Sequence, residues 1–204
     1  MNEEQRKAIS VIGVFCGSGR GSREIYSLKA ASLGSLLSER KITMVYGGGN
    51  IGLMGAIADS MVKAGGRVIG VITEKLVKVE LAHKNIAELR IVGSMSERKN
   101  LIIDLSNAFI IMPGGYGTYD ELFEVLTLCQ LSDIRKPVGL FNVQGYFDHF
   151  AGMIRHSIEE GFIRPEHEQM FFLEDDERSL LDRLEQAKPV KTDKWLENFK
   201  DVKF

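Results

Sequence analysis

Short apolar runs alternate with longer segments in which apolar residues recur every three or four positions, and this alternation continues through nearly the whole chain. Short runs rich in valine and isoleucine are typical of buried strands, whereas the longer periodic segments predict helices. The pattern predicts strands at residues 9–16, 42–46, 67–72, 89–92, 108–112, 138–142 and 170–173. It predicts helices at residues 23–39, 51–64, 94–105, 118–131, 146–160 and 177–187.

Strands that are apolar along their whole length are covered on both faces, which is typical of a parallel sheet between two layers of helices. The sequence therefore predicts an α/β fold, a doubly wound (Rossmann-like) parallel sheet of about six to seven strands with helices on both faces. No linker, repeat or low-complexity segment interrupts the pattern. We expect residues 1–204 to form a single Rossmann-like nucleotide-binding domain, in which residues 1–7 and about 188–204 are tails.

Three glycine-rich turns follow predicted strands, at residues 17–21, 47–49 and 114–117. In a parallel sheet every strand-to-helix turn lies at the carboxyl edge, and ligands bind in the crevice where the winding reverses. In the usual order the first and fourth strands flank that crevice, so the turns after strands one, two, four and five are expected to converge. Exposed N–H groups at a helix N-terminus bind anions. Chain reversal alone explains one such turn, but three at one edge favour a nucleotide or sugar-phosphate site.

Several nucleotide-binding and catalytic motifs are absent from the sequence. The first turn reads G-x-G-x-G, and the second strand ends in Tyr46 and Gly47 where a dinucleotide fold has an acidic residue, so NAD is disfavoured. Neither a G-x-x-x-x-G-K-[ST] loop nor a G-x-S-x-G nucleophile turn occurs. The four histidines lack zinc-ligand spacing, and no lysine stands in a cofactor-linking context. We therefore expect neither a metal nor a cofactor.

Composition and charge limit the classes of binding partner and the cellular compartment that we expect for this protein. The formal net charge is −2 and basic residues are interleaved with acids, so the chain lacks the basic surface typical of nucleic-acid binding. The N-terminus is polar and charged, unlike a signal peptide, and no apolar run approaches the ~20 residues that span a bilayer. Cys16 and Cys129 lie in apolar runs and are interpreted as small buried hydrophobes. These features predict a cytoplasmic protein without nucleic-acid or membrane partners.

Residues 113–121, P-G-G-Y-G-T-Y-D-E, join a predicted buried strand to a predicted helix and end in a carboxylate. Thr118 and Glu121 have the spacing of a capping box, in which the glutamate bonds the backbone at the helix start and needs no further function. A phosphate held by the glycine turn would, however, leave its sugar within reach of Glu121. Such a carboxylate suits cleavage of an N-glycosidic bond, because it can stabilise an oxocarbenium-like transition state or activate water.

Two cations follow Ser94 at the start of the helix after the fourth strand, in the sequence S-M-S-E-R-K. Ser94 and Glu97 have the spacing of a second capping box. The helix dipole disfavours cations at an N-terminus, so Arg98 and Lys99 need an explanation, which an anionic ligand provides. For Lys99, pairing with surface acids is an equally open explanation. Arg98 is a poor general acid because guanidinium stays protonated, so its expected role is to orient the phosphate, the leaving base or Glu121.

The combination of E-R-K at residues 97–99 with the motif at residues 113–121 resembles the LONELY GUY family of cytokinin riboside 5′-monophosphate phosphoribohydrolases, which are often labelled lysine decarboxylases. V-F-C-G-S at 14–18, Y-G-G-G at 46–49 and G-L-M-G at 52–55 extend the resemblance over nearly the whole domain. The resemblance implies hydrolysis of an N6-modified adenosine (cytokinin riboside) 5′-monophosphate, and in some members of plain AMP, to the free base and ribose 5-phosphate. It also implies a homodimer.

The resemblance assigns roles by position: Arg98 and Glu121 match the family's catalytic pair, and Thr118 matches a phosphate contact. Glu80 and Thr127 resemble further family contacts, although a solvated loop acid and a helix-packing hydroxyl are the simpler interpretations of these two. The expected substrate-binding residues are Ser18, Glu80, Met95, Arg98, Lys99, Gly114, Gly115, Tyr116, Gly117, Thr118, Tyr119, Asp120, Glu121 and Thr127.

Two other classes of function remain open. A non-catalytic nucleotide- or cofactor-binding protein is the alternative to the enzyme, although a pure binder has no need of both Arg98 and Glu121. A structural or assembly protein is the third class, because the helix at residues 118–131 is apolar on more than one face and must be deeply buried or packed against a partner. This helix is the expected part of a homodimer interface. Its apolar residues are Leu122, Phe123, Val125, Leu126, Leu128 and Leu131.

Overall fold

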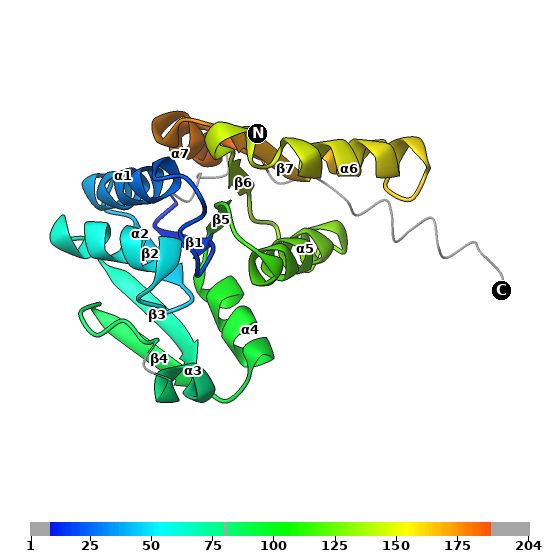
Figure 1. Cartoon of the computed structure of the whole chain (residues 1–204). Helices are drawn as coiled ribbons and strands as arrows, with labels where there is room; N and C mark the ends of the chain where they lie inside the picture. Colours follow the sequence, from blue (N-terminus) through cyan, green and yellow to red (C-terminus); the bar gives the residue numbers. More distant parts are fainter. Residues whose placement is uncertain (1–8, 80, 189–204) are drawn as a thin grey trace, which may run out of the picture.

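The computed structural model describes residues 9–79 and 81–188, which form a seven-stranded sheet with helices on both faces (Figure 1). The strands follow the order β4-β3-β2-β1-β5-β6-β7, and every neighbouring pair is parallel. The strands are β1 (Val11–Phe15), β2 (Thr43–Tyr46), β3 (Val68–Thr73), β4 (Glu88–Val92), β5 (Ala108–Ile111), β6 (Val138–Phe141) and β7 (Phe171–Glu174). The helices are α1 (Ile25–Glu39), α2 (Gly52–Lys63), α3 (Glu74–Lys78), α4 (Met95–Leu105), α5 (Tyr116–Gln130), α6 (Asp148–Glu159) and α7 (Glu177–Gln186), with short 3-10 helices η1 (Val143–Gly145) and η2 (Pro165–Met170).

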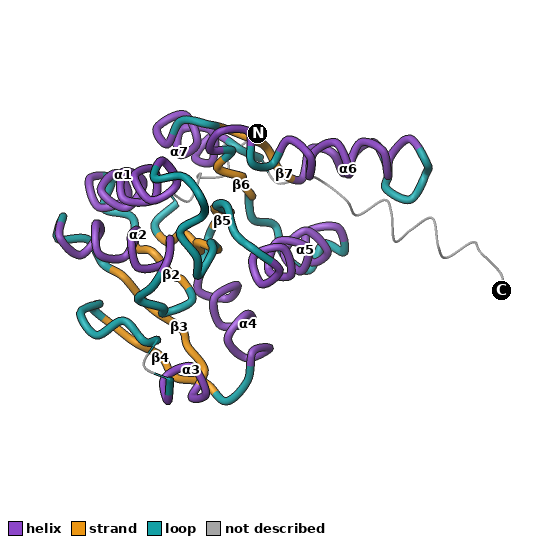
Figure 2. Tube along the Cα trace, viewed as in Figure 1, coloured by secondary structure: helices purple, strands orange, loops and turns teal. Residues whose placement is uncertain are grey.

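Every strand and helix predicted from the hydrophobic pattern is present, with boundaries within two residues of their predicted positions. Figure 2 shows how helices and strands alternate along the trace. The prediction of a doubly wound α/β fold is therefore confirmed. The pattern missed α3, because this helix has five residues and buries none of them, which leaves no hydrophobic period to detect. The predicted tails, residues 1–7 and about 188–204, lie outside the described residues apart from Lys188.

Two hydrophobic layers lie between the sheet and its helices. Successive residues of a strand point to opposite faces, so Ile110 of β5 packs on one side while Phe109 and Ile111 pack on the other. Helices α1, α2 and α7 cover the first side, and α4, α5 and α6 cover the second (Figure 1). Both faces of the sheet are thus buried, as the apolar strands predicted. Within the described residues, no helix is both long and apolar enough to cross a lipid bilayer.

The winding of the sheet reverses between β1 and β5, so the prediction that the first and fourth strands flank the crevice is wrong. The first half of the chain adds three strands outward from β1, which makes β4 an edge strand. The chain then returns to the centre through α4, which contacts β1, β2 and β3 on the way. This return carries Arg98, in the first turn of α4, back toward the crevice.

Gly34 of α1 faces Ile57 of α2 where these two helices pack together. A Cβ added at Gly34 would lie 2.5 Å from the backbone oxygen of Ile57, which cannot move aside as a flexible side chain can. We expect Gly34→Ala to lower the free energy of unfolding by about 1–3 kcal/mol through overpacking, as measured by urea denaturation. Gly152→Ala in α6 is the matched control: nothing lies within 4 Å of its added Cβ, and helix propensity predicts a gain of about 0.5–1 kcal/mol. Unchanged stability of Gly34→Ala would contradict this packing.

Candidate active site

Ser94 caps the start of α4, as the sequence predicted, but Glu97 reaches back to the N–H of Gly93 rather than to that of the cap residue. The Ser94 hydroxyl accepts a hydrogen bond from the Glu97 N–H at 3.1 Å, and the Glu97 carboxylate accepts one from the Gly93 N–H at 2.9 Å. These bonds fix where the helix starts and therefore the position of the next residue, Arg98. The Arg98 side chain is buried, with 6% of its surface exposed.

Three acceptors at the carboxyl edge of the sheet hold the Arg98 guanidinium. Its Nε donates to the backbone oxygen of Val71 in β3 at 2.9 Å, and Nη2 donates to the oxygen of Gly47 after β2 at 3.1 Å. Nη1 donates to Oε1 of Glu121 in α5 at 3.3 Å. Each nitrogen therefore has an acceptor, which compensates for the loss of water around a buried charge. Arg98 and Glu121, which the sequence predicted as a pair, are in direct contact.

The second glycine turn, residues 47–49, makes room for Arg98. A Cβ added at Gly47 would lie 1.8 Å from Arg98 Nη2, so a larger residue would displace the guanidinium. The Gly48 oxygen accepts a hydrogen bond from the His83 N–H at 2.9 Å. Close packing within the protein thus accounts for Gly47, and anion binding by this turn stays a prediction.

The first and third glycine turns are in backbone contact, so the turns after β1 and β5 converge as predicted. The Gly17 N–H donates to the Pro113 oxygen at 3.0 Å. A Cβ added at Gly114 would lie 2.8 Å from the Gly17 nitrogen and 2.1 Å from Thr118 Oγ1. Only glycine allows this approach. The first turn also contacts α2, where the Leu53 N–H donates to the Gly17 oxygen at 3.1 Å.

Helix α5 begins at Tyr116, two residues earlier than predicted, with Gly115 in an extended conformation before it. Thr118 and Glu121 therefore lie inside the helix, and the prediction that they form a capping box is wrong. The cause is the glycine turn, because Gly115 starts the helix without a side-chain cap. Helix capping thus no longer accounts for Glu121, whose carboxylate contacts Arg98 instead. The first N–H groups of α5 have no partner within the helix.

Burial sets the ionisation of Glu121, which is 8% exposed. Loss of water raises the pKa of its carboxyl to about 7, because it disfavours the charged form. The Arg98 guanidinium lowers this pKa and the carboxylates of Asp120 and Glu124 raise it, but burial has the largest effect. A carboxyl that is half ionised near neutral pH, in contact with a fixed cation, is typical of a catalytic site.

Lys99 joins α4 to α5. Its Nζ lies 2.9 Å from Asp120 Oδ2 and 2.9 Å from Glu124 Oε2. Hydrogen bonds to these carboxylates raise the pKa of Lys99, so its charge is retained. Pairing with surface acids therefore accounts for Lys99, and its contact with substrate stays a prediction. The two ion pairs connect the helices that carry Arg98 and Glu121.

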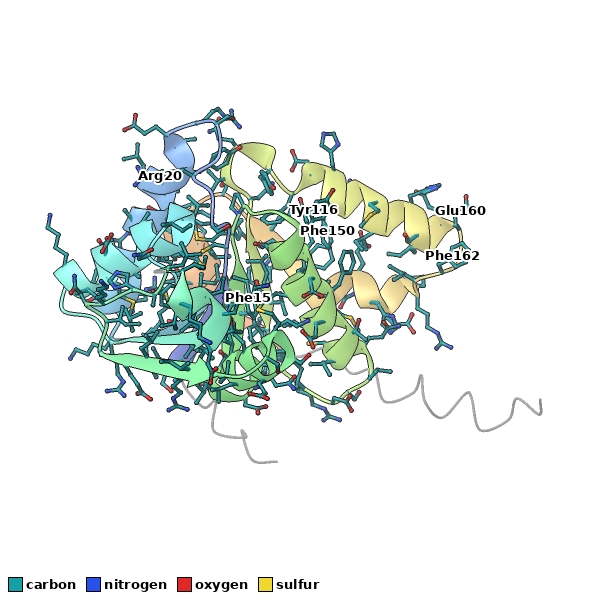
Figure 3. All side chains as sticks on the ribbon, turned by 60° about the horizontal axis from the view of Figure 1, so that its bottom comes forward. Phe15, Arg20, Tyr116, Phe150, Glu160 and Phe162 are labelled. Carbon is teal, nitrogen blue, oxygen red and sulfur yellow. The ribbon has the colours of Figure 1, made fainter. Side chains whose placement is uncertain are left out.

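The other predicted residues of the third turn surround the start of α5. Thr118 is buried, with its hydroxyl against Gly114, whereas Tyr116 in the first turn of α5 (Figure 3) is 96% exposed. Tyr119 is half-buried. The exposed members of the predicted site are Ser18, Met95, Gly115, Tyr116, Gly117 and Asp120.

Two predicted residues are not brought to the Arg98–Glu121 contact. Thr127 lies on a different side of α5 from Glu121, and its hydroxyl donates to the Phe123 oxygen of its own helix at 2.7 Å. Its substrate contact stays a prediction. Glu80 lies outside the described residues. In the part of the chain that the structure describes, no group of three or more His, Cys, Asp or Glu side chains is placed to hold a metal ion.

Sequence reasoning missed Tyr146, whose hydroxyl donates to the oxygen of Gly114. Its place in the segment after β6 and η1 was the only signal, and it carries no motif. The backbone acceptors of Val71 and Gly47 were also missed, because main-chain oxygens are common to all residues. Cys16 is buried near the site and burial raises the pKa of its thiol, so its interpretation as a small buried hydrophobe is confirmed.

Comparisons with known proteins cover most of the chain. The family model described as "Possible lysine decarboxylase" matches residues 54–184. A probable cytokinin riboside 5′-monophosphate phosphoribohydrolase of Oryza sativa subsp. japonica is 45% identical over 177 residues, which cover 87% of this chain and 78% of the relative. A cytokinin riboside 5′-monophosphate phosphoribohydrolase of Arabidopsis thaliana is 40% identical over 187 residues, covering 92% of this chain and 86% of the relative.

Solved structures share the fold at lower identity. The molybdenum cofactor carrier protein of Chlamydomonas reinhardtii has a TM-score of 0.66 at 20% identity, covering 87% of this chain and 97% of that chain. The molybdenum cofactor binding protein of Rippkaea orientalis has a TM-score of 0.65 at 19% identity, covering 88% of this chain and 98% of that chain. These likenesses support the Rossmann-like fold alone. The family model and the relatives at 40–45% identity go further, and the chain belongs to the LONELY GUY family.

Proposed function

We propose that the protein hydrolyses the N-glycosidic bond of N6-modified adenosine (cytokinin riboside) 5′-monophosphates, and of AMP, to the free base and ribose 5-phosphate. The observation that carries the proposal is the buried contact between Arg98 and Glu121 beside the third glycine turn. The names of the relatives support the same activity. The low net charge and free cysteines support a cytoplasmic protein whose ligand is a nucleoside monophosphate rather than nucleic acid.

In the proposed reaction, water attacks C1′ of the ribose as the bond to the base breaks, and positive charge develops on the sugar. The ionised Glu121 carboxylate stabilises that charge or accepts a proton from the attacking water. The water oxygen ends on ribose 5-phosphate, and a proton ends on the free base. Arg98 stays protonated throughout, so it holds the carboxylate in place and favours its ionised form against the effect of burial.

The 5′-phosphate is assigned to the start of α5. Gly115, Tyr116 and Gly117 are exposed there, which leaves N–H groups at the positive end of the helix open to an anion. Thr118 adds a hydroxyl beside this turn. Glu121 follows Thr118 by three residues, a rise of about 4.5 Å along the helix. A ribose is long enough to span this distance, with its 5′-phosphate at the start of the helix and C1′ near Glu121.

A non-catalytic nucleotide or cofactor carrier is the alternative. The molybdenum cofactor proteins among the structural neighbours share the fold at 19–20% identity, which carries no argument about activity. A carrier derives no benefit from a carboxyl that burial has shifted to a pKa of about 7, because desolvating an ionisable group destabilises the fold. The buried carboxyl therefore favours the hydrolase.

Incubation with AMP and with isopentenyladenosine monophosphate, followed by chromatography, tests the proposal directly. We expect free base and ribose 5-phosphate in equal amounts. Glu121→Gln keeps the shape of the side chain and removes its charge, so kcat should fall by about 100-fold or more. Glu74→Gln, at an exposed position of α3, is the matched control. Absence of base release from both substrates would exclude the hydrolase, and full activity of Glu121→Gln would remove Glu121 from the reaction.

The raised pKa of Glu121 predicts how activity depends on pH. The carboxyl is protonated below about pH 7 and ionised above it, so kcat/KM should rise with pH through an inflection near 7. Asp120→Asn removes a charge that raises this pKa, so the inflection should move to lower pH. The phosphate of the substrate also titrates, near pH 6, but it affects the pH profiles of the wild type and of Asp120→Asn equally. An inflection unchanged by Asp120→Asn would contradict the assignment to Glu121.

We also propose a homodimer in which α5 forms part of the interface. Leu122 and Val125 are buried within the protein, whereas Phe123 is 41% exposed on another side of the helix. The Phe123 ring lies 5.7 Å from that of Phe150 in α6, and Met153 of α6 is 47% exposed. An apolar surface that continues across two helices suits a second copy of the chain.

Sedimentation velocity at micromolar protein is expected to show a dimer or larger assembly. Phe123→Glu places a charge on the proposed interface and should shift the protein toward the monomer. Leu28→Glu is the matched control, because Leu28 is 56% exposed on α1, which packs on the opposite face of the sheet. A wild-type protein that sediments as a clean monomer would remove the proposal.

A further inference from the structure

Tyr146 connects parts of the crevice that are far apart in the sequence. It follows η1 after β6, and its hydroxyl donates to the oxygen of Gly114 in the third glycine turn. A tyrosine hydroxyl has one proton, and Tyr146 gives it to Gly114. This bond connects the segment after β6 to the turn that opens α5.

Aromatic packing fixes the Tyr146 side chain. Its ring meets that of Phe147 nearly at right angles, with 5.1 Å between centroids, and meets that of Tyr26 at 6.0 Å in the same manner. Phe147 is fully buried. Tyr26 is held in turn by Arg23, whose guanidinium donates to the Tyr26 hydroxyl at 2.9 Å and lies over its ring. This packing restricts the rotation of the Tyr146 side chain and therefore holds its hydroxyl against the oxygen of Gly114.

The bond to Gly114 orients the peptide group that opens α5. A trans peptide points its C=O and N–H in opposite directions, so fixing the Gly114 oxygen toward Tyr146 directs the Gly115 N–H away from it. Gly115 is the N-cap residue of α5. Adjacent glycines otherwise leave such a peptide free to rotate. A hydrogen bond at the oxygen also polarises the peptide and strengthens its N–H as a donor.

We propose that Tyr146 is a positioning residue for the phosphate-binding turn, because it fixes the peptide between Gly114 and Gly115 before the substrate arrives. The inference rests on the proposed function for the identity of the ligand, a sugar 5′-phosphate. A preorganised donor binds more tightly, since less freedom is lost when the ligand is bound.

Tyr146→Phe keeps the aromatic packing and removes the hydroxyl. We expect it to weaken binding of ribose 5-phosphate about 10-fold in titration calorimetry and to leave binding of adenosine, which has no phosphate, unchanged. In turnover of AMP, KM should rise by a similar factor while kcat changes by less than about twofold. Tyr26→Phe is the matched control, because it removes a hydroxyl beside Tyr146 that does not contact Gly114.

Equal weakening of ribose 5-phosphate and adenosine by Tyr146→Phe, or no weakening of either, would overturn the proposal. A thermal melt first establishes that the variant folds. If it does not, nitrogen-15 relaxation of the Gly115 amide in the ligand-free wild-type protein decides, because a rigid amide supports a turn fixed in advance and a mobile amide overturns it. Calorimetry with ribose 5-phosphate needs no turnover. A wild-type protein that binds this ligand but releases no base would therefore refute the hydrolase and leave the Tyr146 inference standing. Failure of the wild type to bind ribose 5-phosphate would overturn the inference itself.

Discussion

Burial of one guanidinium at the carboxyl edge of the sheet sets the geometry of the site. Arg98 loses its water there, so its nitrogens must find acceptors, and they find them at Val71, Gly47 and Glu121. The end of β3, the turn after β2 and the first half of α5 are thereby placed by one planar group of fixed shape. The burial that brings Glu121 to this cation also raises the pKa of its carboxyl to about 7.

The three glycine turns have different structural roles around Arg98. Gly47 leaves room for the guanidinium, and Gly114 allows the first and third turns to meet at their backbones. A side chain at either position would separate elements that the site requires to be in contact. The third turn combines this packing with a helix start at which Gly115, Tyr116 and Gly117 are exposed, as an anion site requires. The proposed phosphate-binding turn and the Glu121 carboxylate thus both belong to α5.

The decarboxylase description of the family model has no counterpart among the groups at this site. Lys99, the lysine next to Arg98, is paired with Asp120 and Glu124 and keeps its charge. A lysine that forms a covalent link to a cofactor must lose its proton, which two adjacent carboxylates oppose. The groups placed for chemistry are a cation that cannot deprotonate and a carboxyl that titrates near neutral pH. That combination suits stabilisation of positive charge on a sugar.

Hydrophobic periodicity by itself determined the positions of the seven strands and the six longer helices, because burial on one or both faces is recorded in the local order of residues. Motif spacing likewise indicated Arg98 and Glu121. The tertiary structure decided where the winding reverses, where α5 begins, why Gly47 is glycine and that Tyr146 reaches Gly114. Each of these depends on contacts between distant segments, often through backbone atoms, and such contacts leave no periodic pattern in the sequence.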